Sequence, residues 1–167
     1  MGRDKRNENR TEQFTKWIKS ETELPAFLAL SYPARDAYFR IRALCFADTA
    51  QRNPKVRNNN GSIYVSSRWL AEKMGASQKT ARASLADLQA KGFLDCTQEP
   101  RKASHGRGLA PHFRLTMMPM GQGDTWERAT QEPVEWLEGK DYDLVCFKKS
   151  KPKPRNGRVK NFSPAFN

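Results

Sequence analysis

Residues 66–94 constrain the fold of this chain more than any other stretch. They read SSRWLAEKMGASQKTARASLADLQAKGFL, which is two apolar-periodic segments separated by Met74-Gly75-Ala76. Apolar residues recur at helical spacing in each segment: Trp69, Leu70 and Met74 in the first, and Ala81, Leu85 and Leu88 in the second. Ser66 or Ser67 can cap the first helix and Ser77 the second. Gly75 suits the left-handed residue that ends a helix, so the pattern predicts two short helices joined by a tight turn.

Short strands are predicted on either side of this helix pair. Ile63-Tyr64-Val65 precedes it, and residues 93–97 follow it after Gly92. The return strand is marked by alternating apolar residues, namely Phe113, Leu115 and Met117. A loop rich in basic and turn residues, EPRKASHGRGLAP, separates the two later strands. Together they predict a β-hairpin with a basic tip.

An earlier helix is expected from residue 32 onward, with Ser31 as its cap and Pro33 in its first turn. Its predicted apolar stripe consists of Ala37, Tyr38, Ile41, Leu44 and Cys45. Arg35, Arg42 and Asp48 fall mostly off this stripe. The spacing of Phe14, Trp17 and Ile18 predicts a further short helix.

The order helix, strand, helix, turn, helix, strand, loop, strand resembles a winged helix-turn-helix. The residues that carry the resemblance are Leu70-Ala71, Gly75, Ser77, Thr80-Ala81, Leu85, Leu88, Gly92 and Phe93-Leu94. They resemble the winged helices of bacterial regulators of the MarR and GntR types. Residues 24–120 are similar to small winged-helix proteins of phages, plasmids and integrated elements. The resemblance implies a mainly α fold with a β-hairpin wing (α+β) that binds DNA. In contrast to MarR and GntR proteins, these residues predict no large effector domain after the winged helix and no long dimerisation helix.

The charge pattern divides the chain into parts. The formal net charge is +12, which indicates a polyanionic partner. Residues 1–60 and 61–116 each carry +5, residues 117–147 carry −5, and residues 148–167 carry +7. We expect a partly disordered N-terminal arm (1–20), a winged domain (21–120), an acidic extension (121–147) and a disordered basic tail (148–167). The tail either adds affinity for nucleic acid or folds back on the acidic segment and competes with DNA.

The second helix of the pair carries the predicted recognition residues. With its apolar stripe turned inward, Gln78, Lys79, Arg82, Ala83 and Ala86 point outward or to the flank. In the major groove, Arg or Lys can bind guanine and Gln can bind adenine, whereas small Ala residues permit close approach. Arg82 is the predicted main base reader, with Gln78 and Lys79 beside it.

Other polar residues are expected to hold the DNA backbone. Ser77 and Thr80 lie at the start of the recognition helix, where hydroxyl and N–H groups favour phosphate. Arg68 on the preceding helix is a further phosphate candidate. In the hairpin loop we expect backbone or minor-groove contacts from Arg101, Lys102, His105 and Arg107.

Several other classes of protein are disfavoured. Cys45, Cys96 and Cys146 are far apart and odd in number, and we expect reduced, mostly buried thiols in a cytoplasmic protein. His105 and His112 have no ligand partners at metal-binding spacing, so no metal site or cofactor is expected. No constellation of acid, base and nucleophile indicates an enzyme. No apolar run of membrane-spanning length is present.

The sequence favours sequence-specific binding of double-stranded DNA by a transcriptional regulator of a bacterial phage or mobile element, acting in the cytoplasm or nucleoid. No enzymatic activity is expected. A replication initiator or accessory factor would use the same contacts, and a homodimer is compatible with either role. The alternative is a protein-interaction adaptor or phage-encoded inhibitor that uses the acidic segment with Trp126, Trp136 and Phe147.

Overall fold

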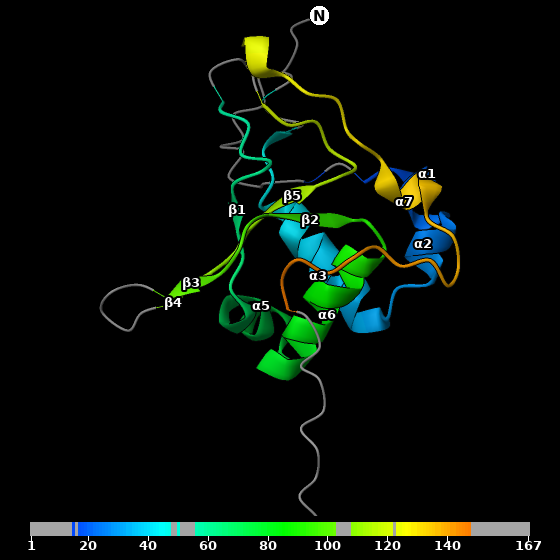
Figure 1. Ribbon diagram of the computed structural model, residues 1–167, viewed down its shortest axis with the longest axis vertical. Helices are drawn as coiled ribbons and strands as arrows, with labels where there is room; N and C mark the ends of the chain where they lie inside the picture. Colours follow the sequence, from blue (N-terminus) through cyan, green and yellow to red (C-terminus); the bar gives the residue numbers. More distant parts are fainter. Residues whose placement is uncertain are drawn as a thin grey trace, which may run out of the picture.

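The computed structural model describes residues 15, 17–47, 50, 56–102, 108–121 and 123–147, and Figure 1 shows how they are arranged. The N-terminal helices are α1 (Lys19–Thr22), α2 (Pro25–Leu28) and α3 (Tyr32–Ala43). The middle of the chain contains β1 (Ile63–Tyr64), α5 (Ser67–Met74), α6 (Gln78–Ala90), β2 (Leu94–Gln98), β3 (Arg101–Lys102), β4 (Gly108–Leu109) and β5 (His112–Leu115). The last elements are the 3-10 helix η1 (Gly123–Thr125) and α7 (Glu132–Glu135). The fold is therefore of the α+β class.

A small antiparallel sheet covers one side of the helices. Its strand order is β1-β5-β2, so the last strand in sequence lies in the middle. Phe113 of β5 lies opposite both Ile63 of β1 and Cys96 of β2. Beyond a register shift that follows Cys96, β3 and β4 pair and extend the β2-β5 hairpin away from the helices (Figure 1). The predicted hairpin is confirmed, although β5 ends at Leu115 and does not include Met117.

Local signals in the sequence set the ends of α5 and α6. The Ser66 hydroxyl accepts a hydrogen bond from the Trp69 N–H at 3.0 Å, and the Ser77 hydroxyl accepts one from the Thr80 N–H at 3.1 Å. Gly75 ends α5 with φ of 62°, a left-handed conformation that costs glycine little. The predicted caps and turn are confirmed here, whereas α6 ends at Ala90, one residue before the predicted end at Lys91.

The core lies where α3, α5, α6 and the sheet meet. Ala81, Leu85 and Leu88 of α6 are fully buried, as their spacing predicts. Phe93 follows α6 and is also fully buried. Its ring lies 5.0 Å from the Tyr38 ring and 6.0 Å from the Phe27 ring, centroid to centroid, both edge-on. Phe93 thus joins α2 and α3 to the start of β2.

Arg42 is buried, although it falls mostly off the predicted apolar stripe of α3. Its side chain is 1% exposed, and Nη1 donates to the buried Glu21 carboxylate at 2.6 Å. The Tyr38 hydroxyl lies 3.3 Å from the same carboxylate oxygen, and burial followed by the charge of Glu21 raises the Tyr38 pKa. The guanidinium also lies over the Trp17 ring at 5.4 Å. A helical wheel of α3 could not anticipate this burial, because the side chains that cover Arg42 come from an earlier part of the chain.

Three further local predictions need correction. Trp17 and Ile18 precede α1 instead of lying in a helix, and Phe14 lies outside the described residues. Ser31 is the residue before α3, but its hydroxyl makes no cap bond and donates instead to Asp87 of α6 at 2.8 Å. The sequence around Trp136 and Leu137 also predicts a short helix, and the structure has α7 there, which ends one residue before Trp136.

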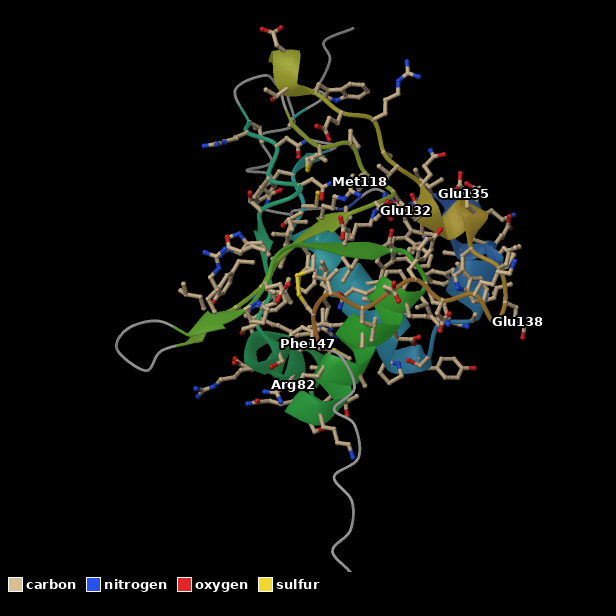
Figure 2. The ribbon with its side chains drawn as sticks, viewed as in Figure 1. Arg82, Met118, Glu132, Glu135, Glu138 and Phe147 are labelled. Atoms are coloured by element: carbon tan, nitrogen blue, oxygen red, sulfur yellow. A yellow bond between two sulfur atoms is a disulfide. The ribbon has the colours of Figure 1, made fainter. Side chains whose placement is uncertain are left out.

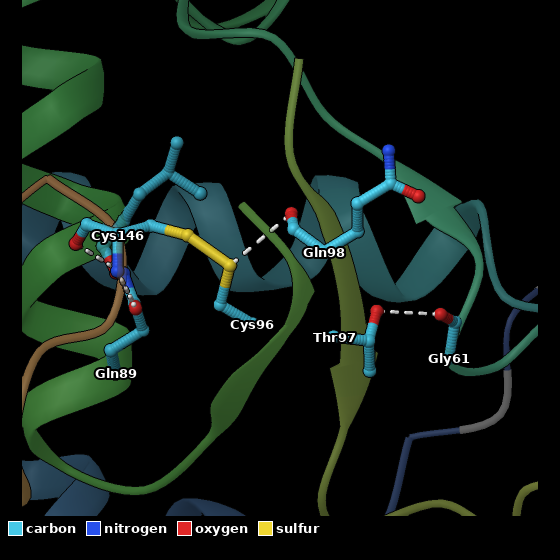
Figure 3. Close-up of a disulfide and its surroundings, with 7 residues drawn as sticks. Gly61, Gln89, Cys96, Thr97, Gln98 and Cys146 are labelled. Atoms are coloured by element: carbon cyan, nitrogen blue, oxygen red, sulfur yellow. Dashed lines mark hydrogen bonds between the residues drawn. A yellow bond between two sulfur atoms is a disulfide. The ribbon is translucent and has the colours of Figure 1, made fainter. Parts of the chain in front are cut away.

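The prediction of reduced cysteines is also wrong for two of them. Cys96 of β2 and Cys146 form a disulfide, which Figure 3 shows beside α6. Cys45 takes no part in this disulfide and is half-buried. The pairing joins residues 50 positions apart in sequence, and nothing in the spacing of the cysteines indicates it. It requires the C-terminal segment to return to the sheet.

That return is made by residues 136–147, which we call the strap. The strap runs from α7 across α6 to β2 (Figure 1). Trp136 and Cys146 are buried in the same core cluster as the α6 residues. The Tyr142 N–H donates to the Ala90 carbonyl at 2.9 Å. The end of the expected acidic extension therefore packs on the domain.

Candidate nucleic-acid interface

The first two turns of α6 present an open polar face. Gln78, Lys79, Arg82 and Ala83 are all exposed, as predicted, and Thr80 is half-buried. Figure 2 shows Arg82 on this outer side of α6, away from the sheet. Ala86, one turn further along, is half-buried. The open face is therefore confined to the N-terminal half of the helix.

The start of α6 has a fixed geometry. The hydroxyls of Ser77 and Thr80 lie 2.9 Å apart, and the Ser77 hydroxyl also accepts the Thr80 N–H. The remaining N–H groups of a first helical turn have no partner within the helix. Such groups, together with the positive end of the helix dipole, favour an anion at this end.

Arg82 leans towards the neighbouring helix. Its Nε lies 3.4 Å from the Ser67 hydroxyl at the start of α5, which is a long hydrogen bond. Arg68 is exposed in the first turn of the same helix. The structure therefore brings Arg82 and Arg68 to adjoining starts of two helices, although they are 14 positions apart in sequence.

The basic and acidic side chains of α6 lie on different faces of the helix. All of its residues are described, and Asp87 is the one acidic residue among them. The Asp87 carboxylate accepts hydrogen bonds from the backbone N–H and the hydroxyl of Ser31, at 2.9 and 2.8 Å. These bonds hold the negative charge against the start of α3, so the open face of α6 carries only neutral and basic side chains. The pairing of Asp87 with Ser31 could not be predicted from the sequence, because no local signal connects the two residues.

Only some of the hairpin residues that are predicted to contact DNA lie within the described part of the structure. Arg101 lies in β3 opposite Leu109 and is exposed, and the backbone of Lys102 lies opposite Gly108. The side chain of Lys102, and the whole of His105 and Arg107, lie outside the described residues. Figure 1 shows β3 and β4 reaching outward on the side of the molecule where α5 begins.

The C-terminal half of α6 is closed by the strap. The Gln89 side chain donates to the Cys146 carbonyl at 3.2 Å and accepts the Cys146 N–H at 3.1 Å (Figure 3). Beside it lies a small pocket lined by Gln89, Gly92, Leu94, Asp95, Thr116, Glu132, Tyr142, Asp143 and Val145. Desolvation, followed by the charges of Glu135 and Glu132, raises the Tyr142 pKa. Three of its lining residues are acidic, and two of them, Asp95 and Glu132, pair with Arg114.

The chain matches no protein-family model, no curated protein and no solved structure. Among the described residues, no helix has the length and apolar character needed to cross a bilayer. No group of three metal-ligating side chains gathers within the same residues.

Proposed function

We propose that residues 21–120 form a winged helix-turn-helix domain that binds double-stranded DNA in a sequence-specific manner. The observation that carries the proposal is the exposed face of Gln78, Lys79, Arg82 and Ala83, from which the single acidic residue of α6 is turned away. An α-helix with such a face fits the major groove of B-DNA.

In this proposal, the start of α6 enters the major groove. Arg82 reads guanine, while Gln78 and Lys79 read neighbouring base edges and Ala83 allows close approach. Ser77, Thr80 and Arg68 contact phosphates, which fix the register without reading sequence. The β3-β4 hairpin, with Arg101, Lys102, His105 and Arg107, follows the backbone or the adjacent minor groove.

The biological role that fits these contacts is transcriptional regulation of a bacterial phage or mobile element, in the cytoplasm. A replication initiator or accessory factor would bind DNA through the same face. A dimer would require two half-sites about 10 base pairs apart, centre to centre.

Selection from a random duplex library at near-physiological salt tests the proposal. We expect the bound fraction to contain a short motif, and we expect Arg82→Ala to lose about 1–3 kcal/mol of discrimination at one position of it. Arg128→Ala is the matched control, because Arg128 is an exposed arginine three positions after η1. Figure 1 shows η1, the short yellow helix, at the opposite end of the molecule from α6. Bound DNA without any motif, or a motif unchanged by Arg82→Ala, would contradict the assigned readout.

A hairpin variant tests the phosphate contacts separately. Lys102→Ala should weaken binding to all duplexes alike and lower the salt slope of log affinity by about 0.9, the value for one released phosphate counterion. Lys140→Ala, an exposed lysine of the strap, should leave the slope unchanged. Titrations at several salt concentrations measure both slopes. If the salt slope of log affinity were equal for Lys102→Ala and the wild type, the proposed contact of the hairpin with DNA would be wrong.

A protein-interaction adaptor is the second candidate, and one observation favours it. Leu28 of α2, Val134 of α7 and Leu137 are each more than half exposed, and α2 contacts α7. Figure 2 shows the acidic residues Glu135 and Glu138 on the side of the molecule where α7 lies. The surface differs from the one expected, because Trp136 is buried and Phe147 packs on the core. Absence of any DNA binding would favour this candidate.

A further inference from the structure

We infer that the surface formed by α2, α7 and the turn at residues 137–140 binds a segment of a partner protein in which apolar residues are flanked by Lys and Arg. We call it the α7 surface. Figure 2 shows Glu135 and Glu138 of this surface on a different side of the molecule from Arg82. The inference therefore goes beyond the proposed DNA binding, because both partners could bind at the same time. It gives the adaptor candidate a partner of defined chemistry.

The apolar part of the α7 surface consists of Leu28, Val134 and Leu137. Their side chains are 61%, 54% and 58% exposed. They come from two elements that contact each other, since α2 lies against α7. Single exposed apolar side chains are ordinary on a soluble protein, whereas a group of them on adjoining elements is typical of a protein-interaction site.

The charge around these apolar residues is negative. Residues 132–143 contain five acidic residues and one lysine. Two of the five, Glu132 and Asp141, pair with basic side chains of the domain. Glu135 and Glu138 are exposed, and neither has an ion pair within the described part of the chain. Such a surface repels the phosphates of nucleic acids and of anionic lipids, and it attracts Lys and Arg.

The backbone fixes the α7 surface from both ends. Gln131 precedes α7 with φ of 59°, a left-handed conformation that is uncommon outside glycine, and its N–H donates to the Thr116 carbonyl at 3.1 Å. Strained backbone of this kind is enriched at binding sites. After α7, Trp136 is buried, and Leu137 forms an isolated bridge with Lys140. A surface that is ordered before binding loses less conformational entropy when the partner arrives.

The apolar and acidic parts of the α7 surface have separate roles in the inferred complex. Apolar side chains of the partner cover Leu28, Val134 and Leu137, and this desolvated centre supplies most of the affinity. Lys and Arg of the partner lie at the rim, beside Glu135 and Glu138. Charges at a rim mainly speed association and select the partner, and salt screens them.

The test uses the full chain and two synthetic amphipathic peptides with the same apolar spacing. One peptide is built from Leu and Lys, and the other from Leu and Glu. We expect the Leu/Lys peptide to bind in the absence of DNA, and the Leu/Glu peptide to remain unbound up to about 1 mM. Fluorescence anisotropy measures both affinities. Amide NMR shifts of the labelled chain should change at the α7 surface and not at the start of α6.

Two double variants separate the apolar from the acidic contribution. Leu28→Ser/Leu137→Ser should weaken binding of the Leu/Lys peptide about tenfold. Glu135→Gln/Glu138→Gln should weaken it about threefold at low salt and hardly at all at high salt. Leu109→Ser is the matched control, because it removes a half-exposed leucine of β4, and it should bind the peptide like the wild type. Both double variants should keep the DNA affinity of the wild type.

Several results would overturn the inference. These are no binding of the Leu/Lys peptide, equal binding of both peptides, or an equal loss in Leu109→Ser and the leucine double variant. Dimerisation that Leu28→Ser/Leu137→Ser abolishes, measured by sedimentation equilibrium, would show that a second copy covers the surface instead. Failure of the proposed function looks different: the chain would bind the peptide but no duplex DNA, and the inference would stand.

Discussion

Arg42→Ala is expected to lower the free energy of unfolding by about 3–5 kcal/mol, the usual cost of removing one partner from a buried ion pair. The substitution leaves the Glu21 carboxylate, itself 2% exposed, without the guanidinium that lies 2.6 Å away. It also removes the cation from the Trp17 ring. Without these two interactions, the segment that precedes α2 should detach from α3. Urea unfolding followed by circular dichroism measures the change in the free energy of unfolding.

Arg40→Ala is the matched control, because Arg40 lies two positions earlier in the same helix. Its ion pair with Asp36 is an exposed one, with both side chains more than a third exposed. Exposed pairs of this kind contribute about 0–1 kcal/mol. Similar losses for the two variants would show that Arg42 acts through helix propensity and not through the buried pair. The double variant Glu21→Gln/Arg42→Met should recover part of the loss, since it buries no unpaired charge.

Phe93→Ala is expected to cost about 3–5 kcal/mol of unfolding free energy, as large-to-small changes in a packed core do. The ring is fully buried and makes edge contacts with Phe27 and Tyr38, so its removal leaves a cavity between α2, α3 and β2. Because Phe93 connects α6 to β2, the same change should loosen the position of α6 relative to the hairpin. Chemical denaturation measures the first effect, and hydrogen exchange of the α6 amides measures the second.

Phe46→Ala provides the control for Phe93. The Phe46 ring is 44% exposed, so its truncation removes less apolar contact and should cost about 1 kcal/mol or less. A loss for Phe93→Ala no greater than that for Phe46→Ala would mean that the site collapses around the missing ring. The cavity argument would then be wrong.

The helix pair was predictable because its signals are local. Serine caps, a left-handed glycine and an apolar repeat at i, i+4 and i+7 act within one or two turns. The structure confirms the caps at Ser66 and Ser77, the turn at Gly75 and the burial of Leu85. The exposed face of α6 follows directly from that burial, so the residues at the centre of the candidate interface could be named from the sequence.

Long-range pairs were not predictable in the same way. Asp87 is held by Ser31, and Cys146 is bonded to Cys96 across 50 positions of sequence. Each pair depends on how separate segments return to the same place, and no spacing rule within one segment carries that information. The closing of the C-terminal half of α6 by the strap belongs to this group as well.

The sequence by itself determined which helix presents basic and small residues outward, because side-chain periodicity and capping are properties of a few neighbouring residues. Only the tertiary structure decided the environment of that helix. It buried Arg42 against Glu21, turned the charge of Asp87 away from the open face, and brought Cys146 to β2. The physical reason is that burial and electrostatic pairing depend on all the segments that pack around a side chain, whereas periodicity depends on one.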